Sequence, residues 1–140
     1  MKILDGEIRP GEGIGEYRLG MDLEQIVEVL NSEYVKEERG NDISVIIIKN
    51  AGFWFSAKEE LFQIGVTNGF QGKYMGKIGI GNTLKDVKRE FGEFYEEYDD
   101  YMIRGINGIA FEISDVEDID DDTWDEMAAP IEWIFIYSAQ

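Results

Sequence analysis

Cysteine and histidine are both absent from the 140 residues of the chain. Without them, a Ser-His-Asp triad, a cysteine nucleophile and a zinc site with nitrogen or sulfur ligands are excluded. The lack of cysteine also rules out disulfide bonds, which fits a reducing compartment. We therefore expect a protein that is not an enzyme and that carries no cofactor.

Basic residues are scarce, because 13 Lys and Arg face 30 Asp and Glu, giving a net charge of -17. Nucleic acid and anionic membranes are poor partners for such a surface, since both are bound through clustered Lys and Arg. A basic protein, in contrast, would be attracted by the complementary field. A simpler interpretation is that the charge only keeps the protein soluble.

Long apolar runs are missing as well, and residues 1–10 (MKILDGEIRP) do not resemble a secretory leader. Hydrophobic residues nevertheless make up 44% of the chain, which is enough for a core. The sequence thus predicts one domain spanning residues 1–140, located in the cytoplasm.

An internal repeat organises the chain, because residues 17–31 (YRLGMDLEQIVEVLN) align without gaps on residues 78–92 (IGIGNTLKDVKREFG). Each copy predicts a short helix, with Asp22 or Thr83 as the N-cap residue. The repeats would cover approximately residues 11–70 and 74–140. The apolar positions expected in the core are Leu23, Ile26, Leu84, Val87 and Phe91.

Strand-like segments follow each helix. They are residues 43–49, 52–55 and 61–67 in the first copy, and residues 101–103, 108–111 and 131–137 in the second. The predicted fold is α+β: two tandem helix-plus-antiparallel-strand repeats form one mainly antiparallel sheet, with both helices on one face. Trp133, Phe135 and Tyr137 share one side of the last strand, and we expect this aromatic stripe to lie in the core.

The repeated helix entry, residues 19–26 (LGMDLEQI) and 80–87 (IGNTLKDV), resembles that of duplicated proteins such as the β-lactamase inhibitor proteins and the outer-membrane assembly lipoproteins. The chain is also similar to small acidic immunity proteins encoded beside bacterial toxins. The resemblance implies an inhibitor or immunity function. The chain departs from these proteins in lacking both a lipoprotein cysteine and the disulfides of the secreted inhibitors.

Two acidic segments are candidate partner-binding sites, residues 93–101 (EFYEEYDDY) and residues 115–126 (DVEDIDDDTWDE). Dense negative charge around a large aromatic side chain suits a cationic groove. In the alternative interpretation the second segment is a solvated loop with Trp124 folded onto the core. The candidate residues are Glu93, Glu96, Glu97, Asp99, Asp100, Asp118, Asp120, Asp121, Asp122, Trp124, Asp125 and Glu126.

A calcium loop is a weaker interpretation of the second acidic segment. Asp118, Asp120 and Asp122 have the alternate spacing of such a loop. However, Thr123 replaces the turn glycine, and Ala129 stands where the bidentate Glu belongs. We therefore expect no metal site there.

The leading hypothesis is an acidic immunity or inhibitor protein that binds a basic toxin, such as a nuclease, and occludes its active site. One alternative is a cytoplasmic adaptor or scaffold with another partner. The other is a carboxylate-dependent enzyme or divalent-metal binder.

Overall fold

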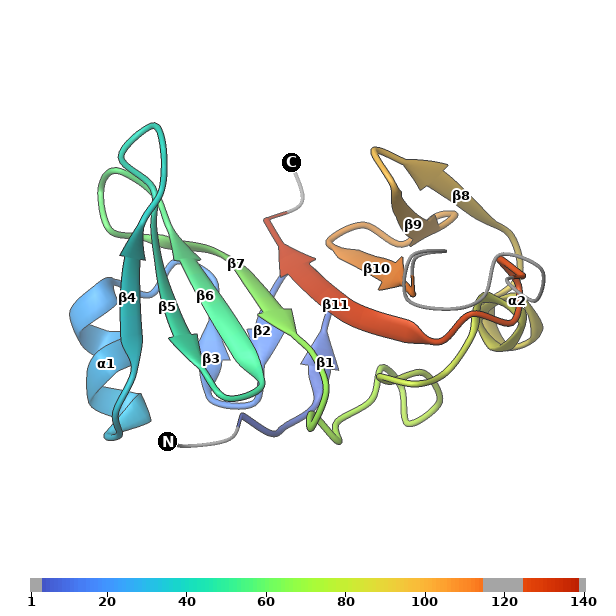
Figure 1. The fold of residues 1–140 in the computed structure, drawn as a ribbon, viewed down its shortest axis with the longest axis horizontal. Coiled ribbons are helices and arrows are strands. Elements are labelled where there is room, and N and C mark those ends of the chain that lie inside the picture. Colours follow the sequence, from blue (N-terminus) through green and yellow to red (C-terminus); the bar gives the residue numbers. More distant parts are fainter. Residues whose placement is uncertain (1–3, 115–124, 139–140) are drawn as a thin grey trace.

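The structure, a computed structural model, describes residues 4–114 and 125–138. Two helices, α1 (Leu23–Leu30) and α2 (Leu84–Phe91), accompany two sheets in this part of the chain (Figure 1). The smaller sheet consists of β1 (Ile8–Arg9), β2 (Gly13–Ile14) and β3 (Tyr17–Arg18).

The larger sheet has eight strands in the order β4-β5-β6-β7-β11-β10-β9-β8, and every neighbouring pair is antiparallel. Its strands are β4 (Val35–Glu38), β5 (Ser44–Ile48), β6 (Ala51–Phe55), β7 (Leu61–Val66), β8 (Phe94–Glu97), β9 (Asp100–Ile103), β10 (Ile109–Ile113) and β11 (Ile131–Tyr137). Four consecutive strands follow each helix, and the two sets join where β7 pairs with β11.

The α+β class and the mainly antiparallel pairing agree with the sequence prediction. The prediction of one sheet is wrong, because β1, β2 and β3 form a separate sheet. Each helix is also followed by four strands instead of three. The unpredicted β4 and β8 are the two edge strands of the large sheet, so each pairs with one neighbouring strand only. Both contain charged residues and lack an alternation of apolar and polar residues.

Both helices begin at the predicted capping boxes. The Asp22 carboxylate accepts a hydrogen bond from the Gln25 backbone N–H at 2.8 Å, and the Gln25 side chain accepts from the Asp22 N–H at 3.0 Å. Thr83 and Asp86 exchange the same pair of bonds at 3.2 and 3.0 Å. Such boxes satisfy backbone donors that a helix leaves free at its start.

The segment before each helix is held by the strand that closes the corresponding set of four. In both places a glycine with φ of +94° donates its N–H to the carbonyl of a strand residue. The N–H of that strand residue in turn donates to the carbonyl of the residue that follows the glycine. The four bonds are Gly20 to Leu61 at 2.8 Å, Leu61 to Met21 at 2.8 Å, Gly81 to Ile131 at 2.9 Å and Ile131 to Asn82 at 2.7 Å.

The core lies between the large sheet and a layer formed by the helices, the small sheet and the loop of residues 67–83 (Figure 1). Ile26, Leu84 and Val87 are buried in it, as predicted, whereas Leu23 and Phe91 are only partly buried against it. Neither α1 nor α2, the helices of the described residues, has the length and apolar character needed to cross a membrane.

Candidate functional site

The first acidic segment folds as a hairpin of β8 and β9 at the edge of the large sheet, and we call it the acidic hairpin. Its tip is the two-residue turn of Tyr98 and Asp99, whose φ angles are 54° and 69°. Two positive φ angles are typical of a type I′ turn, which Gly and Asn adopt much more easily than Tyr. The Tyr98 side chain is 91% exposed, so the turn presents an aromatic ring to solvent.

The carboxylates of this tip lack basic partners among the described residues. None of the ion pairs found there includes Glu96, Glu97, Asp99 or Asp100. Glu93, at the base of the hairpin, differs because it pairs with Arg104 at 3.4 Å. Uncompensated negative charge is therefore concentrated at the tip.

The environment of Asp100 disfavours its negative charge. Its partial burial, and secondarily the neighbouring charge of Asp99, raise the pKa of the Asp100 carboxyl above its usual value. Both causes disfavour the charged form. The hairpin thus keeps a carboxylate where the folded protein would be more stable without its charge.

Only part of the second acidic segment can be placed. Asp118, Asp120, Asp121, Asp122 and Trp124 lie outside the described residues, as does the candidate calcium spacing. Within residues 4–114 and 125–138, no group of three or more carboxylates is arranged to hold a metal ion.

Asp125 and Glu126 are described, and Glu126 joins the two acidic segments. Its Oε2 accepts a hydrogen bond from the Tyr101 hydroxyl of β9 at 2.9 Å. Burial first, and then this bond, raise the pKa of the Tyr101 phenol. Asp125 has a local role, because its Oδ1 accepts from the Met127 backbone N–H at 3.0 Å.

A second surface lies on the large sheet. The strands turn one side toward the core, and we call the other side the open face; it carries Trp54, Gln63, Trp133, Phe135 and Tyr137. The predicted aromatic stripe of β11 lies on this face and is half-buried, whereas Ile134 and Ile136 of the same strand point into the core. The expectation that the stripe belongs to the core was therefore wrong. Alternation shows which residues share a side but not which side is covered.

Two glycines make room for aromatic rings of the open face to lie close to the sheet backbone. A Cβ atom on Gly52 would come within 2.9 Å of the Trp54 ring, and one on Gly65 within 2.9 Å of the Phe135 ring. Phe135 stacks on Trp133 with centroids 5.6 Å apart and meets Trp54 edge-on at 6.1 Å. The result is a connected aromatic surface across β6, β7 and β11.

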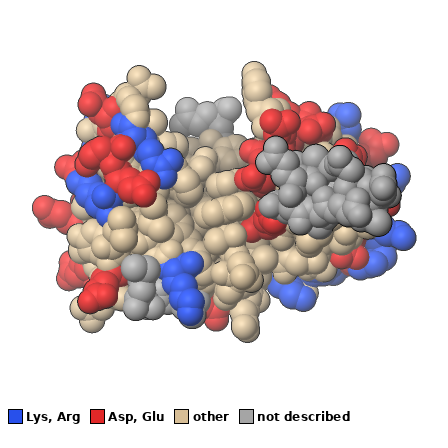
Figure 2. Space-filling view, in the orientation of Figure 1, with Lys and Arg blue, Asp and Glu red and all other residues tan. Residues whose placement is uncertain are grey.

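The open face and the acidic hairpin adjoin each other. Figures 1 and 2 view the open face, since the small sheet is drawn behind β7 and β11, and the centre of this view is uncharged. At the β11 side, burial raises the pKa of the Tyr137 phenol, a hydrogen bond with the Gly108 backbone lowers it, and the charges of Glu97 and Asp100 raise it slightly. Asp100 alternates with the buried Tyr101 and pairs with Glu97 in register, so both carboxylates lie on the open-face side of the large sheet.

A pocket of about 440 Å³ extends the open face beside Trp133. Ile80 and Ile131 supply apolar walls, and Glu132 supplies a carboxylate that accepts a hydrogen bond from the Ser114 hydroxyl at 3.0 Å. No sequence motif indicated this pocket, because its lining comes from four segments that are separate in the sequence.

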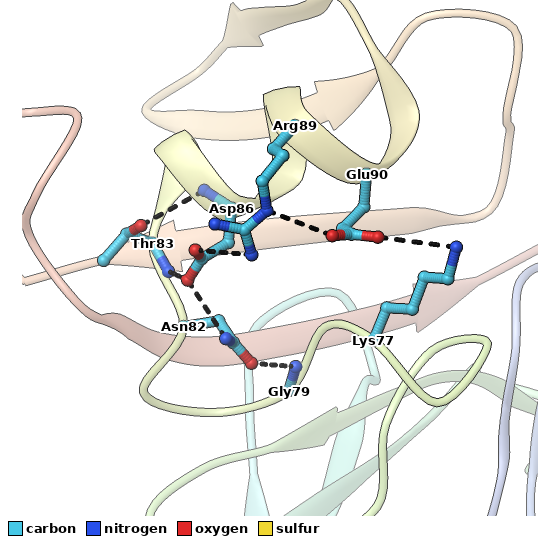
Figure 3. Close-up of polar contacts among 7 residues, drawn as sticks. All are labelled: Lys77, Gly79, Asn82, Thr83, Asp86, Arg89 and Glu90. Atoms are coloured by element: carbon cyan, nitrogen blue, oxygen red, sulfur yellow. Dashed lines mark hydrogen bonds and ion pairs between the residues drawn. The ribbon is translucent and has the colours of Figure 1, made fainter.

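The polar cluster at the start of α2 contrasts with the hairpin, because its charges are compensated (Figure 3). The Asp86 carboxylate accepts from the Asn82 side chain and the Thr83 backbone, each at 3.0 Å, and pairs with Arg89 at 3.1 Å. The hydrogen bond from Asn82 contributes most to lowering the pKa of Asp86. This cluster anchors the helix, and its carboxylates are paired with Arg89 and Lys77.

Comparison with known proteins gives information on the fold only. No protein-family model and no curated protein matches the chain. A solved structure, that of the uncharacterized protein YfeY from Escherichia coli, is similar with a TM-score of 0.57 and 15% sequence identity. The match covers 91% of this chain and 97% of YfeY. At this identity it supports a shared architecture.

Proposed function

We propose that this chain is an acidic immunity or inhibitor protein that binds a basic toxin, with a nuclease as the leading case, and occludes its active site. The observation that carries the proposal is the acidic hairpin, whose tip holds four carboxylates without basic partners among the described residues. Glu37, Glu38, Asp86 and Glu90 are paired with Lys or Arg, whereas other exposed carboxylates, such as Glu24 and Glu28, also lack a basic partner among the described residues. The tip differs from these because its four carboxylates lie together within residues 96–100 of one hairpin. At Asp100 the charge also opposes folding, since burial and the charge of Asp99 raise the pKa of its carboxyl, and such perturbed groups occur preferentially at functional sites.

The turn at the tip supports a binding role. Tyr98 is held in a backbone conformation that costs about 1 kcal/mol or more for a residue of this kind. Its ring nevertheless packs on nothing, being 91% exposed. Exposed aromatic side chains within a charged surface are typical anchors of protein interfaces.

We also infer that the chain consists of two tandem repeats with both helices on one face of the large sheet. The mirrored strand order, the two capping boxes and the equivalent backbone bonds at Gly20 and Gly81 support this inference. It strengthens the resemblance to duplicated inhibitor and immunity proteins. YfeY, being uncharacterized, adds nothing on function.

The test is co-expression with the product of the adjacent open reading frame, because immunity proteins accompany their toxins. We expect that product to stop growth alone and to be neutralised by this protein. Replacing Glu96, Glu97, Asp99 and Asp100 by their amides should abolish protection. The matched control neutralises Glu16, Glu24, Glu28 and Glu33, four exposed carboxylates outside the hairpin. Two of them, Glu24 and Glu28, belong to α1, which lies at the opposite end of the molecule from the hairpin (Figure 1).

Equal loss of protection in both variants would show that only net charge matters and would contradict the hairpin as the site. If the neighbouring product is harmless and no basic protein binds at physiological salt, the immunity proposal fails. The adaptor or scaffold interpretation then replaces it.

A further inference from the structure

The open face has the features of a protein interface. Within residues 4–114 and 125–138, the buried side chains of both helices and of the small sheet join the core cluster on the other side of the large sheet. The rings of Trp54, Trp133 and Phe135 remain half-buried on the open face. The two outer strands add the exposed side chains of Val35 and Tyr95 to the same side of the sheet.

Aromatic side chains that neighbouring groups hold in place contribute strongly to protein interfaces. A ring that is already half-buried and held by its neighbours loses little conformational freedom when a partner covers it. Gly52 and Gly65 provide this preorganisation, since each leaves space for a ring that a side chain would displace. Gln63 lies between Trp54 and Tyr137 in register, so the centre of the face contains a polar but uncharged group.

The charges around the face indicate the chemistry of the partner. Glu97 and Asp100 lie on the same side of the large sheet as the rings, and Glu132 brings a carboxylate to the pocket beside Trp133. A guanidinium over a ring has a precedent in this molecule, because Arg104 lies 5.6 Å from the centre of the Tyr95 ring. A second copy of the chain fits poorly, since each copy carries a net charge of -17.

On these grounds, and resting on the proposed function, we propose that the open face is the main docking surface for the basic partner. The occupant is a segment of that partner which combines apolar side chains, placed on the rings, with Lys or Arg. One long basic side chain enters the pocket, where its stem contacts Ile80 and Ile131 and its charge faces Glu132 and the Trp133 ring. The acidic hairpin forms the charged border of this surface.

The test uses synthetic peptides as probes, so that it does not depend on the identity of the toxin. One peptide combines Lys and Arg with Leu and Trp, a second has the same charge with Ser and Gly, and a third combines Glu with Leu and Trp. Nuclear magnetic resonance titration of the full chain locates binding through the side-chain N–H signals of Trp54 and Trp133. We expect the first peptide to bind at least about tenfold more tightly than the other two and to shift both signals.

Two matched variants identify the surface. Gln63→Arg places a positive charge in the centre of the open face and should weaken binding of the first peptide about tenfold or more. Gln71→Arg makes the same change at an exposed position of the loop of residues 67–83. It should alter the affinity for the first peptide less than about twofold. Thermal unfolding of both variants checks that Gln63→Arg remains folded.

The outcomes separate the two proposals. If the second peptide binds as well as the first and shifts only signals of the acidic hairpin, the open-face proposal is overturned while the acidic binding site stands. If no basic peptide binds, the open-face proposal is overturned, and the co-expression experiment decides the proposed function independently. If sedimentation shows a dimer that Gln63→Arg dissociates, a second copy occupies the face and the proposal is likewise overturned.

Discussion

Asp100 and Asp86 are two carboxylates of one molecule whose environments shift their pKa values in opposite directions. Burial and the charge of Asp99 raise the pKa of Asp100, so its ionised form is disfavoured in the folded protein. Hydrogen bonds from Asn82 and Thr83 lower the pKa of Asp86, so its ionised form is favoured. Each shift is also a statement about stability as a function of pH.

The sign of each effect follows from linkage. Charging Asp100 costs stability, and this cost grows as pH rises above 3.8 and is complete above the raised pKa of the folded state. Asp100→Asn should therefore raise the urea midpoint at neutral pH and lose this advantage in acid. Asp86→Asn should lower the midpoint at neutral pH, and its deficit should vanish as pH falls below 3.8 through the lowered folded pKa. Parallel curves for the two variants across this range would contradict both assignments.

At the scale of elements, the acidic hairpin combines strain with exposure in a single turn. Tyr98→Asn should stabilise the protein by about 0.5 to 1 kcal/mol, because Asn tolerates a positive φ much better than Tyr. It should also speed dissociation of the toxin, since an interface anchor is removed. Tyr34→Asn, at a partly exposed position outside the hairpin, is the control and should do neither. Urea unfolding and surface plasmon resonance measure the two effects, and unchanged dissociation would remove Tyr98 from the interface.

Elements that are determined by local sequence signals were predicted, whereas elements that depend on tertiary pairing were not. Both helices are specified locally, by capping boxes and apolar spacing, and were predicted with their N-cap residues. The edge strands β4 and β8 were missed because their residues face solvent or carry charge, so that no alternation marks them. Their strand conformation comes from pairing with β5 and β9, which is tertiary information.

The candidate site likewise has a part that the sequence predicted and a part that it did not. The acidic segments were visible in the sequence as charge, and the hairpin brings Glu96, Glu97, Asp99 and Asp100 to one tip. The open face was not predicted, although the alternation of β11 indicated that three aromatic residues share one side. Which side receives the helices depends on the packing of the whole chain, and the sequence pattern alone does not contain that choice.

For the molecule as a whole, the distribution of charge should govern association with a basic partner. Exposed charges attract over a distance that salt shortens to about 8 Å at physiological ionic strength. The association rate measured by stopped flow should therefore fall steeply with added salt, whereas the dissociation rate should change little, because the aromatic contacts of the open face are not screened. A dissociation rate that rises as steeply as the association rate falls would indicate a purely electrostatic complex.

The pairing of β7 with β11 has a consequence for how the chain folds. Neighbouring strands within each set of four are joined by connections inside that set, whereas this seam must close a long loop that contains α2 and the strands from β8 to β10. Loop-closure entropy makes such a contact a late one, so changes in the seam should mainly alter the rate of unfolding. Two chains that open at this seam together can each complete the other, with residues 67–83 as the hinge. Refolding at high protein concentration is then expected to yield a domain-swapped dimer. Every native strand pair is kept in it, but β7 and β11 of each pair come from different chains.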